Sequence, residues 1–165
     1  MTKALARSVV LGAATIALSL VSPAALAAGQ TGHAAAAIGE FITIVENKQI
    51  DFASMLPTAA GGNVVVSTNG VITAPGGFVL VGTPSAGSFT SQSFAGFPAV
   101  VTFGGSVLLA DGAGHTMTLG TFTNNAPANF DGGGNLPFKV GATLTVGANQ
   151  APGHYIGTYT VTVNW

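Results

Sequence analysis

Two stretches near the C-terminus decide the fold of this chain. Residues 138–146 read Phe-Lys-Val-Gly-Ala-Thr-Leu-Thr-Val, and residues 155–165 read Tyr-Ile-Gly-Thr-Tyr-Thr-Val-Thr-Val-Asn-Trp. In the second stretch one face carries, apart from Gly157, aromatic and β-branched side chains: Tyr155, Tyr159, Val161, Val163 and Trp165. Because successive side chains of a strand point to opposite faces of the sheet, this period of two predicts half-buried antiparallel strands.

Upstream of these stretches, short runs of the same kind are separated by Gly, Pro, Asn and Asp. The expected strands are residues 41–45, 63–67, 78–81, 99–103, 106–110, 115–123, 138–146 and 155–165. Within 115–123 the alternation slips after Leu119, so we expect a bulge at Gly120 that returns Phe122 to the core. About eight strands, with no convincing amphipathic helix among them, predict an all-β antiparallel sandwich with immunoglobulin-like layering.

The same alternation predicts which side chains form the hydrophobic core. These are Ile42, Ile44, Val64, Val66, Phe78, Leu80, Val101, Leu108, Met117, Leu119, Leu144, Val146, Tyr159, Val161 and Val163.

The N-terminus has the pattern of a secretory signal peptide. Lys3 and Arg7 precede an uncharged apolar run over residues 9–21, and Ala25-Leu26-Ala27 supplies a cleavage site of small residues. We therefore expect a signal peptide over residues 1–27, a flexible lead over 28–39 and one β-sandwich domain over 40–165. The expected destination is the periplasm, the outer surface or the extracellular space.

Composition excludes several classes of protein. The chain has 165 residues, of which only nine are Asp, Glu, Lys or Arg, and its formal net charge is −1. Without a basic patch it is not expected to bind nucleic acid. Because it contains no Cys, disulfides, thiolate catalysis and zinc-thiolate sites are excluded.

The C-terminal pattern also carries a family resemblance. The run Val140-Gly141-Ala142-Thr143-Leu144 is followed by Gly153-His154-Tyr155-Ile156-Gly157-Thr158-Tyr159-Thr160-Val161-Thr162-Val163-Asn164-Trp165. This succession resembles the bacterial exported proteins of the domain of unknown function family 4402. A looser likeness links it to spore-coat-U and pilin-type secreted β-sandwich subunits. The resemblance implies an exported β protein and no particular activity.

Side chains that could carry chemistry are few. His33, His115 and His154 do not share a metal-ligand spacing, and no Gly-x-Ser-x-Gly motif marks a nucleophilic serine. Asp111 and Asp131 each precede Gly, a dipeptide typical of turns. We therefore predict no catalytic residue, no cofactor and no metal site, and we expect that the protein is not an enzyme.

Three functional hypotheses remain. The first is a structural or surface-assembly subunit that self-assembles by strand addition, because the Thr-rich strands lack the charges that guard sheet edges. The candidate donor strands are the lead through Val45 and the terminal strand over residues 155–165. The expected assembly strand carries Tyr155, Tyr159, Val161, Val163 and Trp165. The second is a small outer-membrane β-barrel, suggested by the terminal aromatic strand. The third is a monomeric adhesive module that contacts a surface or glycan through its aromatic side chains.

Overall fold

The computed structural model describes residues 42–165, and every regular element in that part of the chain is a β-strand. There are eleven strands: β1 (Thr43–Lys48), β2 (Ser54–Leu56), β3 (Gly62–Val66), β4 (Ile72–Thr73), β5 (Val79–Val81), β6 (Gly87–Gln92), β7 (Val100–Phe103), β8 (Val107–Ala110), β9 (Thr116–Asn124), β10 (Asn135–Val146) and β11 (Val161–Asn164). The all-β antiparallel prediction is confirmed, and the expected number of about eight strands is too low. The expected signal peptide and the whole of the expected lead lie outside the described residues.

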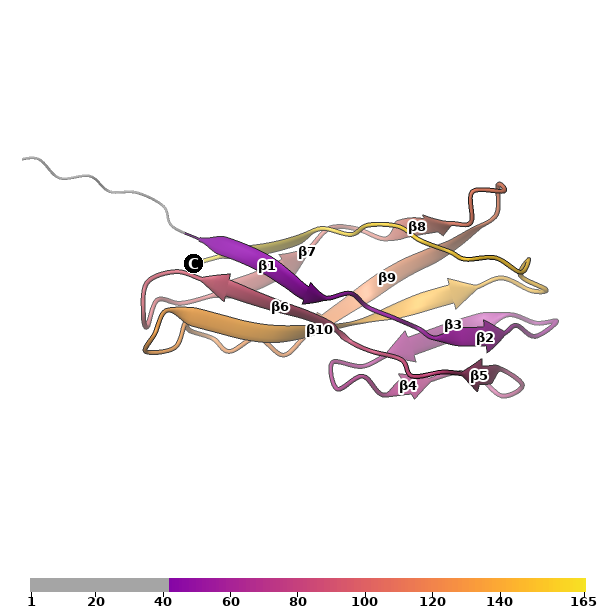
Figure 1. Ribbon diagram of the computed structural model, residues 1–165, viewed down its shortest axis with the longest axis horizontal. Helices are drawn as coiled ribbons and strands as arrows, with labels where there is room; N and C mark the ends of the chain where they lie inside the picture. The colour runs from indigo at the N-terminus through magenta and orange to yellow at the C-terminus, as the bar shows by residue number, and fades with distance from the viewer. Residues whose placement is uncertain (1–41) are drawn as a thin grey trace, which may run out of the picture. The chain divides into compact units, whose positions relative to one another are not determined.

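Seven of the strands form one antiparallel sheet organised around β10. The first half of β10 pairs with β6 and the second half with β3, while β9 pairs along its other edge. Strand β1 then pairs with β6, β4 with β3, and β8 with β9. Figure 1 shows β10 crossing the domain, with β1 and β6 over one half and β3 and β4 at the other.

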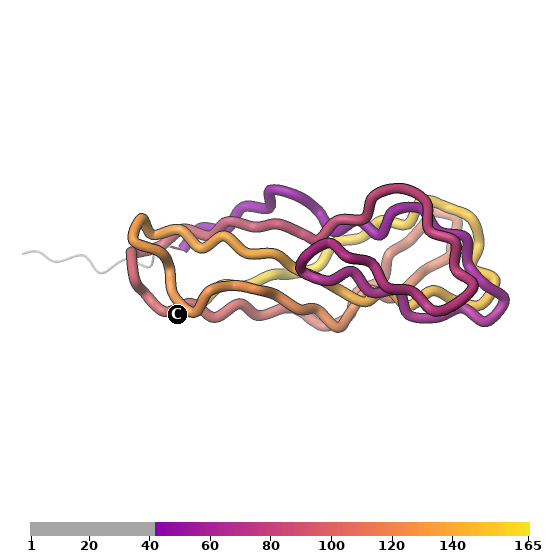
Figure 2. The backbone as a smooth tube through the Cα atoms, turned by 90° about the horizontal axis from the view of Figure 1, so that it is seen from below, coloured from indigo at the N-terminus to yellow at the C-terminus, as the bar shows by residue number. Residues whose placement is uncertain are grey.

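The remaining four strands form two separate ribbons, β7 with β11 and β2 with β5. Figures 1 and 2 both place the β2–β5 ribbon at the end of the domain opposite the C-terminus. The large sheet curls, and the expected immunoglobulin-like layering of two stacked sheets stays a prediction.

Alternation along β10 builds the core, as its sequence predicts. Leu136, Phe138 and Val140 are buried with Phe89, Phe130 and Val163 in one cluster. Ala142, Leu144 and Val146 continue on the same face into a second cluster, with Phe52, Val64, Val66, Leu109 and Leu119. Each fully buried side chain of this size contributes about 1.5–3 kcal/mol. Strand β10 is therefore the main source of apolar burial in the domain.

The predicted bulge is confirmed in β9. Gly141 of β10 pairs with Thr123 and Thr143 with Gly120, so β9 carries one extra residue, and Thr121 adopts a positive φ of 47°. A Cβ at Gly120 would lie 2.6 Å from the Ser106 hydroxyl oxygen, so a larger residue here would displace the Ser106 side chain. The shift turns Phe122 back towards both core clusters.

Strand β6 is absent from the prediction because its buried face is largely polar. Its inward positions are Gly87, Phe89 and Ser91, so a single large apolar residue carries the signal. The Ser91 hydroxyl donates to the Thr43 carbonyl oxygen at 2.7 Å, which satisfies its hydrogen-bonding requirement inside the sheet. A strand with such a face does not alternate in hydropathy, although it holds the middle of the sheet between β1 and β10.

Two predicted core residues are exposed. Leu108 is 61% exposed, whereas its neighbour Leu109 is 9% exposed and faces the core. The run from Val107 to Leu109 is apolar on both faces, so alternation does not decide its parity. Ile44 is 38% exposed because β1 lies at the edge of the sheet.

The expected terminal strand over residues 155–165 is shorter than predicted. Only Val161–Asn164 form a strand, and the stretch before it makes one isolated bridge, from Ile156 to Ala110. Trp165 is 45% exposed, with its ring edge-to-face with Phe97 at a centroid distance of 6.5 Å.

Candidate functional site

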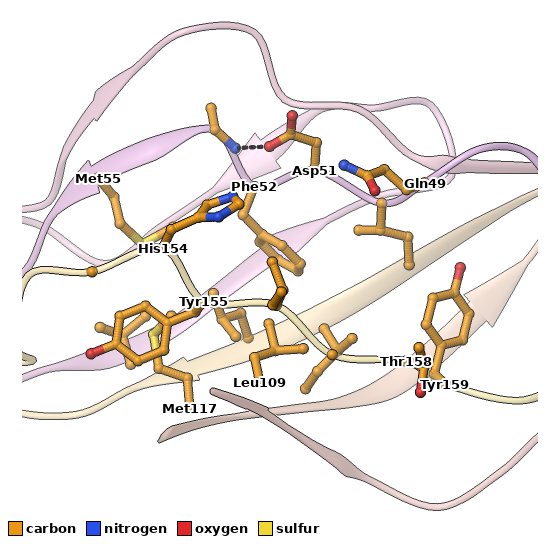
Figure 3. Close-up of a pocket in the computed structure, with 18 of the residues that line it drawn as sticks. Gln49, Asp51, Phe52, Met55, Leu109, Met117, His154, Tyr155, Thr158 and Tyr159 are labelled. Carbon is orange, nitrogen blue, oxygen red and sulfur yellow. Dashed lines mark hydrogen bonds between the residues drawn. The ribbon is translucent and has the colours of Figure 1, made fainter. Parts of the chain in front are cut away.

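A groove of about 920 Å³ lies between two extended segments of the chain, residues 44–57 and residues 150–161 (Figure 3). The part of its lining that comes from the large sheet, including β8, is apolar. It consists of Phe89, Leu109, Met117, Leu119, Leu144 and Val146. Phe52 and Met55 add to this lining from the first segment. The groove therefore reaches the side chains of the hydrophobic core.

The backbone of the first border is paired on the side away from the groove. Strand β1 pairs with β6, and β2 pairs with β5. Between them, Asp51 exchanges two backbone hydrogen bonds with Ser85, at 2.9 and 2.8 Å.

The second border is also bonded to strands behind it. Ile156 exchanges backbone hydrogen bonds of 2.9 and 3.0 Å with Ala110, and the Thr160 carbonyl accepts one of 3.0 Å from Gly104. Within residues 42–165, no backbone hydrogen bond crosses the groove from 44–57 to 150–161. A single bond joins the two sides just beyond it, from the Asn149 N–H to the Thr58 carbonyl at 3.1 Å. The groove is thus a seam between a β edge, formed by β1 and β2, and a facing border that contains the Ile156 bridge and the first residue of β11.

Polar side chains of the groove lie along its borders. Gln49, Asp51 and His154 are labelled in Figure 3, where they lie above the apolar side chains of Leu109 and Met117. The Asp51 carboxylate accepts the Ala53 N–H at 2.7 Å, which supports the positive φ of 57° at Ala53. The carboxylates that line the groove are those of Glu46 and Asp51, so its charge is acidic and small.

The Tyr155 hydroxyl makes more hydrogen bonds than the hydroxyl of Tyr159, the other tyrosine in the groove lining. Its hydroxyl donates to the Ala151 carbonyl at 2.7 Å and accepts from the Gln150 side-chain amide at 2.8 Å. These bonds fix the second border where it turns into the groove.

Tyr159 packs well but its hydroxyl is unpaired. The ring stacks on Phe122 at 5.0 Å and meets Phe89 edge-on at 6.3 Å. The hydroxyl oxygen is buried and has no hydrogen-bond partner among the residues described. Burial raises the pKa of Tyr159, and the Glu46 charge raises it further, so the phenol stays neutral.

The structure places the residues of the expected assembly strand in three different environments. Tyr155, Tyr159 and Val161 line the groove, whereas Val163 is buried in the core. Trp165 stacks with Phe97 and is not part of the groove lining. Sequence analysis predicted only the start of the first border, in the strand expected over residues 41–45, and missed the rest of it. The alternation of Ile50 and Phe52 with polar neighbours is a signal that could have found that part.

The turn interpretation of Asp111 is confirmed. Its carboxylate accepts the backbone N–H groups of Ala113 at 2.8 Å and His115 at 3.0 Å. The other carboxylate oxygen lies 2.6 Å from Nδ1 of His115, and this hydrogen bond is the main cause that lowers the pKa of Asp111. The pair lies in an exposed turn far along the sequence from His154, and His33 lies outside the described residues.

Asp131 holds a second turn in the same way. Its carboxylate accepts the N–H groups of Gly133 at 2.9 Å and Asn135 at 2.7 Å, and these bonds lower the pKa of Asp131. In residues 42–165 no group of three or more His, Asp or Glu side chains could hold a metal ion. That part of the chain also contains no helix long and apolar enough to cross a membrane.

Comparison with known proteins assigns the chain to one family. Residues 42–165, which include both borders of the groove, match the family described as Domain of unknown function (DUF4402). The chain belongs to this family, as its C-terminal pattern predicts. No curated protein and no solved structure matches it significantly.

Proposed function

We propose that this protein is an exported, non-enzymatic structural subunit that assembles by adding a β-strand at the groove. The observation that carries the proposal is the seam itself. Two extended edges face each other across an apolar lining, and no backbone hydrogen bond joins them. An unpaired strand edge is a template for pairing with another chain.

An entering strand would gain two kinds of interaction at this site. Its backbone would pair with the free edge of β1, and alternate side chains would cover Phe52, Leu109 and Leu119. Each apolar side chain that becomes fully buried contributes about 1.5–3 kcal/mol. Few charges oppose this, since Lys48 is the only Lys or Arg on β1.

Two further features support the proposal. Side chains of β6 and β10 share one core cluster with those of β7 and β11, which favours the sandwich-like layering of secreted subunits. Export is supported by the charged, apolar and small-residue regions over residues 1–27. The periplasm, the outer surface and the medium remain the proposed destinations.

The test is to purify the exported protein and material sheared from the cells, and to examine both by size-exclusion chromatography and electron microscopy. We expect multimers or fibres. Thr158→Lys, which places a charge on the groove border, should reduce them, whereas Thr162→Lys, on a strand position outside the groove lining, should not. Monomers in every fraction would rule out the proposal.

A second candidate function, adhesion to a glycan surface, has an observation of its own. The rings of Phe94, Phe97 and Trp165 form an exposed cluster, with centroid distances of 5.4 Å and 6.5 Å. Exposed aromatic faces can stack on sugar rings. Binding to a glycan array that is lost in Trp165→Ala and kept in Thr158→Lys would favour this function.

A further inference from the structure

We infer that the strand entering the groove is the segment Gly29–Phe41 of a second copy of this chain. This inference rests on the proposed function and adds the identity of the partner segment. It follows from which parts of the chain are already paired, from the chemistry of the groove and from the direction of β1.

The other candidate strands are engaged in their own domain. Strand β1 pairs with β6 over Thr43–Lys48, and β11 pairs with β7 over Val161–Asn164. Val163 of β11 is 7% exposed within a core cluster, so removing this strand would open the core. Residues 29–41 precede β1 in the sequence, so donating them would not require breaking these described strands.

The segment suits the groove in chemistry and in length. It reads Gly-Gln-Thr-Gly-His-Ala-Ala-Ala-Ala-Ile-Gly-Glu-Phe, with four consecutive small apolar residues and one carboxylate. The four alanines are an uncharged stretch of small side chains, which fits over a groove lining that already includes the large side chains Phe52 and Leu109. In extended form, residues 29–41 span roughly 43 Å at about 3.3 Å per residue, enough to follow the whole border 150–161.

The direction of β1 favours a second copy over the same chain. Thr43 pairs with Gln92, and the groove is lined from Ile44 onwards in the direction of Pro57. Ile42 packs against a core cluster, which fixes where the chain enters β1. Because the groove lies along residues 44–57, downstream of that point, the chain before Ile42 would have to reverse its direction to enter the groove of its own domain.

The absence of cysteine allows a direct test by disulfide formation. Exported protein carrying Thr158→Cys is mixed with protein carrying a single Cys at one of the positions Ala34–Ala37, and oxidised mildly. We expect disulfide-linked heterodimers at alternate positions only, because side chains of a strand alternate and a disulfide requires Cα atoms roughly 4.4–6.8 Å apart. Thr162→Cys, exposed but outside the groove lining, is the matched control and should give only background.

Three results would overturn the inference. They are equal yields at all four alanine positions, equal yields with the Thr162 control, and a double variant Ala35→Cys/Thr158→Cys that closes only within one chain. If either of the first two is found while multimers still form, the partner segment is wrong and the proposed function stands. Closure only within one chain would mean that the segment fills the groove of its own domain, so the second copy would be wrong. If the unmodified protein is monomeric throughout, the proposed function itself fails.

Discussion

Replacing Tyr159 with Phe should stabilise the domain. The hydroxyl oxygen is buried without a partner among the residues described, and such a group costs roughly 1–3 kcal/mol in lost hydration. Phenylalanine keeps the ring that stacks on Phe122 and meets Phe89. We expect the free energy of unfolding to rise by about 1 kcal/mol, which corresponds to a Tm higher by roughly 3–6 °C for a domain of this size.

Tyr155→Phe is the matched control because the Tyr155 hydroxyl makes two hydrogen bonds, with Ala151 and Gln150. Its removal should lower the free energy of unfolding by about 1–2 kcal/mol. Urea unfolding followed by the fluorescence of Trp165, the single tryptophan of the chain, measures both variants. If Tyr159→Phe destabilises the protein as much as the control, the hydroxyl has a partner and the reasoning is refuted.

Three other predictions concern turns and the core. Backbone hydrogen bonds lower the pKa of Asp131 below its ordinary value of 3.8, so the unfolded chain binds the proton at higher pH. Thermal melts should therefore show Tm falling from about pH 5 to about pH 2, and Asp131→Asn should reduce that fall. Gly134→Ala should lower the free energy of unfolding, measured in urea, by more than about 2 kcal/mol, because Gly134 has a φ of 76° and a Cβ there would strike the Ser93 carbonyl oxygen. Gly132→Ala is the control: its Cβ would enter open space, so the free energy of unfolding should change by less than about 0.5 kcal/mol. Leu144→Ala should cost about 2–5 kcal/mol and Leu108→Ala less than about 1 kcal/mol, and equal losses would contradict the assigned parity.

Sequence reasoning succeeds where local alternation and burial coincide. Strand β10 alternates over its whole length, and each of its apolar positions from Leu136 to Val146 is buried. The bulge in β9 was predictable because Leu119 and Phe122 change parity across a glycine. In both elements the pattern needed to assign the structure lies within a few consecutive residues.

Strand β6 and the groove depend on partners that are distant in sequence. The buried Ser91 is acceptable only because the Thr43 carbonyl, 48 positions away, accepts its hydroxyl. The groove combines residues 44–57 with residues 150–161, and neither stretch alone indicates that the two stay unpaired. Sequence analysis therefore found the tyrosines of one border and only the first residues of the other.

The seam stays open because the C-terminal border is bonded towards β8 and β7. Ile156 bridges Ala110, and Gly157 lies so close to β8 that a Cβ there would be 2.7 Å from the Leu108 carbonyl oxygen. These contacts direct the border away from β1, which is itself paired with β6. A strand that binds in the groove would therefore meet two edges that are already extended and ordered. Because the cost of ordering those edges is met when the domain folds, more of the binding free energy would be available to hold the added strand.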